Sequence, residues 1–162
     1  MLKWLWLSSI VFVLDLATKL WATSALSLYE RVPMTSFFNI TLAHNTGAAF
    51  SFLADAGGWQ RWFFTAVAAV VSTVIVVRLK RLPANEKLQA CGLALVLGGA
   101  IGNVLDRVMH GYVVDFLDFY YGTYHWPAFN VADMAIVGGA ALLIWHSLFC
   151  QPKENKAAKA EK

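Results

Sequence analysis

Two carboxylates, Asp115 and Asp133, stand out because each lies among apolar residues. Asp115 follows Val113 and Val114, and Asp133 lies about one turn into an apolar block with no basic residue near it in the sequence. Two carboxylates held close together in a low-dielectric site share one proton, because both cannot ionise cheaply. One group can then activate water while the other donates a proton, which is aspartic protease chemistry. Spacing alone leaves open that both are capping or surface carboxylates.

Several polar residues surround these two positions in the sequence. Asn130 precedes Asp133 by one helical turn and stands where a helix cap would stand. Asn103 lies on the same helical face as both Asp106 and Arg107, because residues three and four apart are neighbours on a helix. The plain alternative is a charge pair at the end of a helix. Small residues at Gly98, Gly99 and Gly102 allow close helix approach or leave room for a ligand.

Asp15 and Lys19 interrupt the first apolar block with a spacing of i, i+4. Ionisable side chains within a membrane span cost at least about 2.5 kcal/mol each at the bilayer centre. The two charges can neutralise each other on one helical face. We expect them either to fasten this helix to its neighbours or to support a catalytic site above them.

Other kinds of catalytic site find little support. His44, His110, His125 and His146 show no HExxH pairing, and no serine lies in a GxSxG context, so we expect no metal and no serine nucleophile. Cys91 and Cys150 both lie in apolar blocks and are expected to be inert core thiols.

The composition indicates an integral membrane protein. Of the 162 residues, 59% are hydrophobic and only 14% are charged, whereas soluble domains carry roughly 25% charged residues. Four apolar blocks have about the length that crosses a bilayer. They are residues 4–22, 59–77, 88–105 and 131–150. We therefore predict an all-α membrane protein with a single domain over residues 1–150.

The basic residues predict the orientation in the membrane. They gather before the first block, between the second and third blocks, and after the fourth block, so the positive-inside rule places these three regions and both termini in the cytoplasm. The segments 23–58 and 106–130 then face outward. The net charge of +3 follows from this topology, and we expect no nucleic-acid partner.

The outer segments suggest a small β element. Residues 37–42 alternate as a half-buried strand does, and a turn at 45–47 allows residues 48–53 to return as a second strand. We expect a small hairpin or sheet on the outer membrane surface. The pattern of residues 113–121 fits a strand and a short interfacial helix equally well. The lysine-rich residues 151–162 are expected to form a disordered cytoplasmic tail.

Four sequence blocks, taken together, resemble the signatures of the signal peptidase II family. They begin at Asn45, Gly98, Val113 and Phe129, and read NTGAAFS, GGAIGNVLDR, VVDF and FNVAD. Asp15 and Lys19 look like the family's first block. The order, the spacing and the four-span layout agree over nearly the whole chain.

This resemblance implies an aspartic endopeptidase of the bacterial inner membrane, acting at its periplasmic face without a cofactor. Its substrates would be diacylglyceryl-modified prolipoproteins, cut just before the lipobox cysteine. Asp115 and Asp133 would be the catalytic pair. The residues lining the substrate site would be Asn45, Gly47, Asn103, Arg107 and Asn130. Membrane lipids and the inhibitor globomycin are further expected partners, and we expect a monomer.

Two other functions remain open from the residues themselves. A non-catalytic four-span protein, such as a lipid-binding or assembly factor, could use the same polar residues only for packing. Proton or ion transport would need ionisable residues along a continuous path, which the inner halves of the last three blocks do not offer. Replacing either aspartate by asparagine separates catalysis from packing, because size and most hydrogen bonds are kept.

Overall fold

A computed structural model describes residues 1–47 and 58–150 of the chain. Its described residues include four helices that are long and apolar enough to cross a membrane, which confirms the predicted four-span fold. Their bounds are α1 Leu5–Ala25, α2 Trp59–Arg81, α3 Lys87–His110 and α4 Val131–Trp145. A 3-10 turn, η1 (Leu2–Trp4), precedes α1, and a π-helical turn, η2 (His146–Cys150), continues α4.

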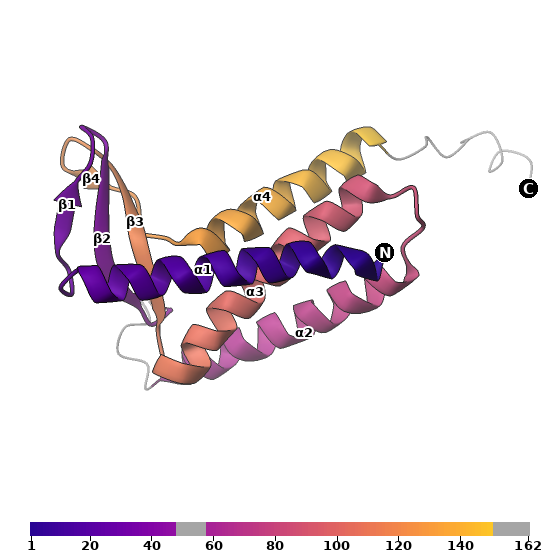
Figure 1. Ribbon diagram of the computed structural model, residues 1–162, viewed down its shortest axis with the longest axis horizontal. Coiled ribbons are helices and arrows are strands. Elements are labelled where there is room, and N and C mark those ends of the chain that lie inside the picture. Colours follow the sequence, from indigo (N-terminus) through magenta and orange to yellow (C-terminus); the bar gives the residue numbers. More distant parts are fainter. Residues whose placement is uncertain (48–57, 151–162) are drawn as a thin grey trace, which may run out of the picture.

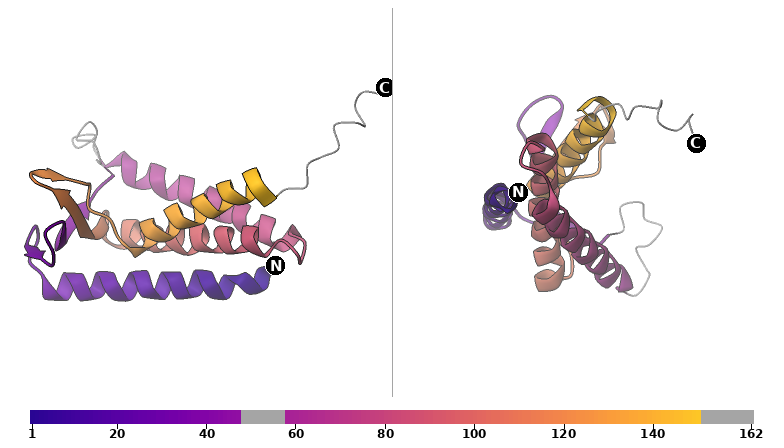
Figure 2. Two further views of the ribbon diagram at one scale, coloured as in Figure 1. Left: turned by 90° about the horizontal axis from the view of Figure 1, so that it is seen from above. Right: turned by 90° about the vertical axis from the view of Figure 1, so that its right-hand side faces the viewer.

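Helix α3 lies at the centre of the bundle and contacts the other three helices (Figures 1 and 2). Its glycines permit this close packing. A β-carbon at position 98 would lie 2.7 Å from the backbone oxygen of Ser8 in α1, and one at position 99 would collide with the backbone oxygen of Ala132 in α4. Small residues at helix contacts are typical of membrane bundles, where backbones approach one another directly.

One end of the helix bundle carries a four-stranded antiparallel sheet in the order β1-β2-β3-β4. The strands are β1 Arg31–Pro33, β2 Phe38–Asn45, β3 Val113–Tyr121 and β4 Tyr124–His125. The predicted β element is confirmed, and residues 113–121 are a strand rather than a helix. The expected return strand at 48–53 lies outside the described residues; in the described part of the chain, β2 pairs with β1 and β3.

The predicted alternation along β2 holds only in part. Its register with β3 shifts between Ile40 and Ala43, and Asn39, Thr41 and Leu42 are all buried. The polar side chains of the strand are buried because β3 and the residue just before β1 supply partners. Asn39 Nδ2 donates to Asp118 Oδ2 at 2.9 Å, and Thr41 Oγ1 donates to the Glu30 carbonyl at 2.7 Å.

Two connections join the sheet to the helices and place the site between them. Helix α3 ends at His110, and the left-handed conformation of the next residue, Gly111 (φ +87°), turns the chain into β3. The backbone of β3 also pairs with Phe129, two residues before the start of α4. A buried cluster of Ala22, Leu42, Val114 and Phe116 packs the sheet against the outer end of α1. The start of β3 and the start of α4 therefore lie side by side.

Candidate active site

Asn130 begins α4 and fixes the position of Asp133 in its first turn. The Asp133 backbone N–H donates to Asn130 Oδ1 at 3.0 Å, and the Asn130 N–H donates to Asp133 Oδ2 at 3.3 Å. This reciprocal pair satisfies two backbone donors that a helix start otherwise leaves without partners. The carboxylate of Asp133 is therefore held by the fold of the helix end itself.

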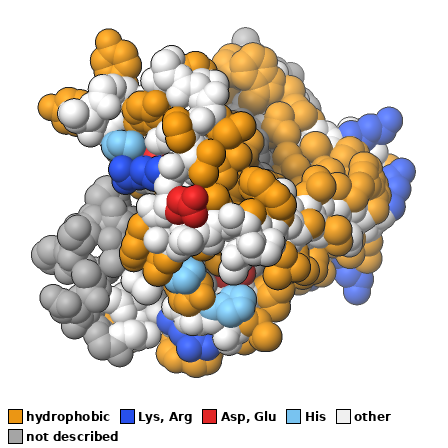
Figure 3. All heavy atoms as spheres, turned by 60° about the vertical axis from the view of Figure 1, so that its left-hand side comes forward, with side chains coloured by type: hydrophobic (Ala, Val, Ile, Leu, Met, Phe, Trp, Pro, Cys, Tyr) orange, Lys and Arg blue, Asp and Glu red, His pale blue; other side chains and the backbone are white. Residues whose placement is uncertain are grey.

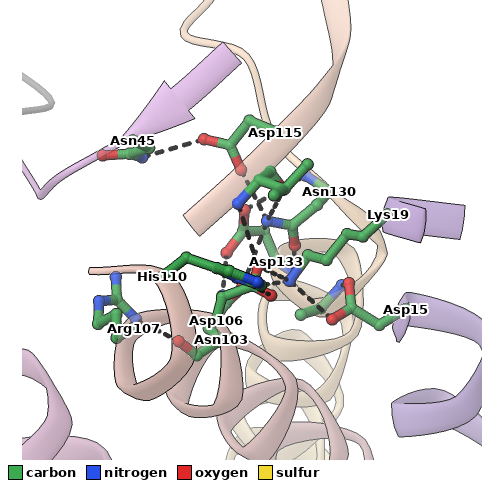
Figure 4. A network of polar contacts seen from close by, with 12 residues as sticks. Asp15, Lys19, Asn45, Asn103, Asp106, Arg107, His110, Asp115, Asn130 and Asp133 are labelled. Atoms are coloured by element: carbon green, nitrogen blue, oxygen red, sulfur yellow. Dashed lines mark hydrogen bonds and ion pairs between the residues drawn. The ribbon is translucent and has the colours of Figure 1, made fainter. Parts of the chain in front are cut away.

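Asp115 points from β3 toward the same helix end (Figure 4). Its side chain accepts a hydrogen bond from Asn130 Nδ2 at 2.7 Å and one from Asn45 Nδ2, on β2, at 3.0 Å. Only 2% of the residue is exposed. The side chain of Asn130 thus contacts both Asp115 and Asp133, and it joins the two carboxylates that the sequence singled out.

The surroundings of Asp115 favour its protonated form. Burial, reinforced by the nearby charge of Asp133, raises the pKa of Asp115 to about 7, while hydrogen bonds from Asn45 and Asn130 act in the opposite direction. A carboxyl with this pKa carries a proton below neutral pH and can release it near neutral pH, as a general acid must.

Asn103 and Arg107 border the pair from the last turns of α3. Asn103 Nδ2 donates to Asp133 Oδ1 at 2.8 Å, and the Arg107 guanidinium donates to the Asn103 carbonyl at 3.2 Å while lying 5.4 Å from the centre of the Phe64 ring. The structure therefore places both residues beside Asp133, and Arg107 supplies a positive charge next to the two acids.

Lys19 joins two further carboxylates beneath the site. Its ammonium lies 2.7 Å from Asp15 Oδ2 and 2.9 Å from Asp106 Oδ2, and it donates to Asn103 Oδ1 at 3.0 Å. Asp15 Oδ1 accepts the backbone N–H of Ala132, and Asp106 Oδ2 accepts that of Val114. Each of these N–H groups belongs to the residue just before one of the two central aspartates, so this buried cluster, which we call the Lys19 brace, holds both backbone segments.

Gly47 acts on the site through Asn45. Its N–H donates to Asn45 Oδ1 at 2.9 Å, which leaves the amide nitrogen of Asn45 directed at Asp115. Gly47 has φ +92°, and a β-carbon there would lie 3.0 Å from the Phe64 ring. A glycine therefore suits both the backbone conformation and the available space.

Two residues of this region were not among the predicted site residues. Asp106 was noticed only as part of a helix-end charge pair, although its position three residues after Asn103 places both on the face that meets Lys19. His44 was considered only as a metal ligand. It borders a cavity of about 220 Å³ that also reaches Asp115, Asn45 and Pro127, and its ring stacks on Tyr112 at 3.8 Å. Burial and the proximity of His110 lower the pKa of His44, so the ring lines this cavity in its neutral form.

Comparison with known proteins identifies the family. The family model described as signal peptidase (SPase) II matches residues 7–149. The lipoprotein signal peptidase of Alteromonas mediterranea is 57% identical over 143 residues, covering 88% of this chain and 79% of that protein. The lipoprotein signal peptidase of Psychromonas ingrahamii is 52% identical over 162 residues, covering 96% and 94%.

A solved structure described as a bacterial membrane enzyme, determined by the in meso method, superposes with a TM-score of 0.81. It is 26% identical in sequence, and the match covers 93% of this chain and 96% of that one. The resemblance in sequence thus extends to the arrangement of the four helices and the sheet. The chain belongs to the signal peptidase II family and is a membrane-spanning, aspartic-type peptidase.

Proposed function

We propose that the chain removes signal peptides from diacylglyceryl-modified prolipoproteins, cutting N-terminal to the lipobox cysteine, with Asp115 and Asp133 as the catalytic pair. The main observation in support is that one side chain, that of Asn130, hydrogen-bonds to Asp115 and caps the helix turn that contains Asp133. Two acids from different elements are thereby held together at the outer end of the bundle. The names of the relatives, lipoprotein signal peptidases, support the substrate class.

The first chemical step is attack of water on the scissile carbonyl. Asp133 accepts a proton from the water while the oxygen forms a bond to the carbonyl carbon. Asp115, whose raised pKa keeps a proton on it, donates that proton to the carbonyl oxygen. The product is a tetrahedral diol, and the amide groups of Asn103 and Asn45 hold the two carboxyl groups in place.

The second step breaks the carbon–nitrogen bond. Asp133 gives the proton it received from water to the leaving amine nitrogen, and one diol hydroxyl returns its proton to Asp115. The signal peptide leaves with a new carboxyl group, the mature lipoprotein keeps the new amino group, and both aspartates regain their starting states.

The position of the pair suits a substrate that is already in the membrane. A signal helix and two acyl chains hold the scissile bond near the interface, so the substrate reaches the site by lateral movement between helices instead of by diffusion from water. Asn45, Gly47, Asn103, Arg107 and Asn130 line or support this approach, and Asp15 with Lys19 supports it from below. We expect globomycin to block the same site.

The distribution of basic residues supports the orientation of the protein. Helix α2 ends in Arg78, Lys80 and Arg81, and Lys87 begins α3, at the end of the bundle remote from the sheet. We propose that this end, with both termini, faces the cytoplasm of a bacterial cell. The sheet and the catalytic pair then lie at the periplasmic face of the inner membrane.

The proposal is tested by cleavage of a purified diacylglyceryl-modified prolipoprotein, followed by gel shift. We expect the wild-type enzyme to cut the substrate and globomycin to stop it. The variants Asp115→Asn and Asp133→Asn should each lose activity by a factor of about 10² or more, because an amide cannot exchange protons as a carboxyl group does.

The matched control is Asp118→Asn, which alters another buried aspartate on β3 outside the pair. It should keep measurable cleavage. Near-normal activity in a folded Asp115→Asn or Asp133→Asn enzyme would remove that residue from the catalytic pair. Failure of the wild-type enzyme to cut a lipidated substrate would favour a non-catalytic role.

A further inference from the structure

A second polar cluster lies in the sheet, away from the catalytic pair, and is centred on Asp118. Its carboxylate lies 2.9 Å from His125 Nδ1 on β4, accepts a hydrogen bond from Asn39 on β2 at 2.9 Å, and lies 3.8 Å from Arg31 Nε on β1. Asp118 itself is on β3 and is 3% exposed. One buried carboxylate therefore contacts side chains from the three other strands and ties the strands together at this end of the sheet.

The same end of the sheet carries aromatic side chains that the described part of the chain leaves exposed. Tyr121, Tyr124 and Trp126 are 87%, 82% and 70% exposed, and we call these three residues the aromatic tip. Beside them is an open hollow of about 360 Å³, lined mainly by aromatic rings and by His125, which stacks on Tyr120 at 5.3 Å. Leaving three large rings in water forgoes the free energy that burial would supply.

The position of the aromatic tip indicates which surroundings can bury its rings. The strands run across the ends of the helices, and the β3–β4 end of the sheet reaches past the start of α4, on the side toward which α4 slopes (Figure 1). Figure 3 shows hydrophobic side chains projecting at this end, with few charged groups among them. Because the four helices are long and apolar enough to cross a bilayer, the sheet at their ends lies at the level of one bilayer surface.

We propose that the aromatic tip docks in the phospholipid headgroup layer of the outer leaflet and thereby fixes the height of Asp115 above the membrane. Tyrosine and tryptophan are the residues that favour this layer, because their rings are apolar and their polar atoms remain wet. Arg31, whose side chain is 59% exposed and lies 3.8 Å from Asp118, adds a permanent positive charge to this end of the sheet, which complements lipid phosphates.

The aromatic tip can fix the height of Asp115 because β3 joins the two. Asp115 and Tyr121 lie on β3, about 20 Å apart at the usual strand rise. Docking one end of a strand restricts the depth of the other. The proposal that docking fixes the height of Asp115 rests on the proposed function, because the acyl chains would hold the substrate's scissile bond at a constant depth. The docking of the aromatic tip does not rest on the proposed function.

Docking is tested without any activity measurement, by reconstituting the full chain into phosphatidylcholine vesicles whose acyl chains are brominated at a shallow or a deep position. The fluorescence contributed by Trp126 is obtained as the difference between the wild-type protein and Trp126→Phe. We expect shallow bromines to quench most of this difference and deep bromines to quench less of it. The matched reference is Trp145→Phe, because Trp145 is an exposed residue of a membrane-spanning helix.

If Trp126 fluorescence is quenched by aqueous iodide and not by either brominated lipid, the tip faces water and the docking is wrong. If deep bromines quench Trp126 more strongly than shallow ones do, the tip is not in the headgroup layer and the proposal also fails.

The height is tested by combining Tyr121→Ser and Tyr124→Ser and measuring cleavage of two substrates. Cleavage of a lipidated prolipoprotein in vesicles should fall several-fold, while cleavage of a short lipopeptide in detergent should stay unchanged. Tyr121→Phe with Tyr124→Phe, which keeps both rings, should restore cleavage in vesicles. Equal losses on both substrates would overturn the height function, whereas absence of cleavage by the wild-type enzyme would contradict the proposed function and leave the quenching result standing.

Discussion

Asp115 is surrounded by groups that act on its proton in opposite directions. Burial and the charge of Asp133 favour the protonated carboxyl, while the amides of Asn45 and Asn130 donate to its oxygens and favour the ionised form. The resulting pKa of about 7 is a balance, so removal of one group shifts it in a direction that can be stated in advance.

This balance predicts a pH profile. The kcat/KM for a lipidated substrate should fall as the pH rises above about 7, because Asp115 then loses the proton that it gives to the carbonyl oxygen. Asn45→Ala removes a donor that favours the ionised form, so the pKa of Asp115 rises. The descending limb should move to higher pH by about one unit.

The control for this measurement is Asn39→Ala, on the same strand. Asn39 donates to Asp118 and not to Asp115, so its removal should leave the position of the descending limb unchanged. A limb that stays in place, or moves to lower pH, in Asn45→Ala would contradict the assignment of the shared proton to Asp115.

At the scale of secondary-structure elements, the Lys19 brace is the principal connection. Lys19 comes from α1, Asp106 comes from α3, and the two accepting carboxylates bind backbone groups at the starts of β3 and α4. Four segments thus meet at one ammonium group, at a depth where isolated charges are costly.

Replacing Lys19 alone should destabilise the protein more than replacing Lys19 together with Asp15 and Asp106. Lys19→Met leaves Asp15 and Asp106 buried without their counter-ion, and we expect a loss of about 3–5 kcal/mol in the free energy of unfolding. Adding Asp15→Asn and Asp106→Asn to Lys19→Met should recover part of this loss, since amide oxygens still accept the backbone N–H groups. Denaturant unfolding in detergent measures the stability of both variants. A triple variant less stable than Lys19→Met would contradict this account.

The contact between α3 and α4 permits a comparison of two glycines. A β-carbon at Gly99 collides with the backbone oxygen of Ala132, so Gly99→Ala must displace the first turn of α4, which carries Asp133. We expect a loss of about 1–3 kcal/mol in stability together with reduced kcat.

Gly138→Ala is the matched control on α4. A β-carbon there meets no atom within 4 Å among the described residues, and alanine favours helices by about 1 kcal/mol over glycine. This variant should be as stable as the wild type or more stable. Equal effects of the two substitutions, seen in thermal unfolding and in activity, would show that the contact at Gly99 does not position α4.

At the scale of the whole molecule, the sequence allowed prediction of the features that depend on local pattern. The spans follow from continuous apolar runs, and the central aspartates attracted attention because they interrupt such runs. The partners of β2 could not be predicted, because β3 lies far along the chain and strand pairing is not local. The role of Asp106 was also missed, since only the contact of α1 with α3 brings Lys19 to it.

The orientation of the whole molecule can be tested with its own cysteines. The expectation that both thiols lie in the core is wrong, because Cys150 is exposed at the end of η2 and Cys91 within α3 is partly exposed. A membrane-impermeant maleimide should label Cys150 in inverted inner-membrane vesicles and not in intact spheroplasts. The variant Cys150→Ser should lose this labelling; labelling from the periplasmic side would reverse the proposed topology.

The pairing of Asp15 with Lys19 also bears on how the chain enters the membrane during synthesis. These are the two charged residues of α1, so this helix leaves the ribosome with no net side-chain charge before Asp106 has been translated. Val114 and Ala132, which donate to the brace, come still later in the sequence. The nascent chain can therefore insert α1 early, and the proposed catalytic pair is brought together only after α4 has been synthesised.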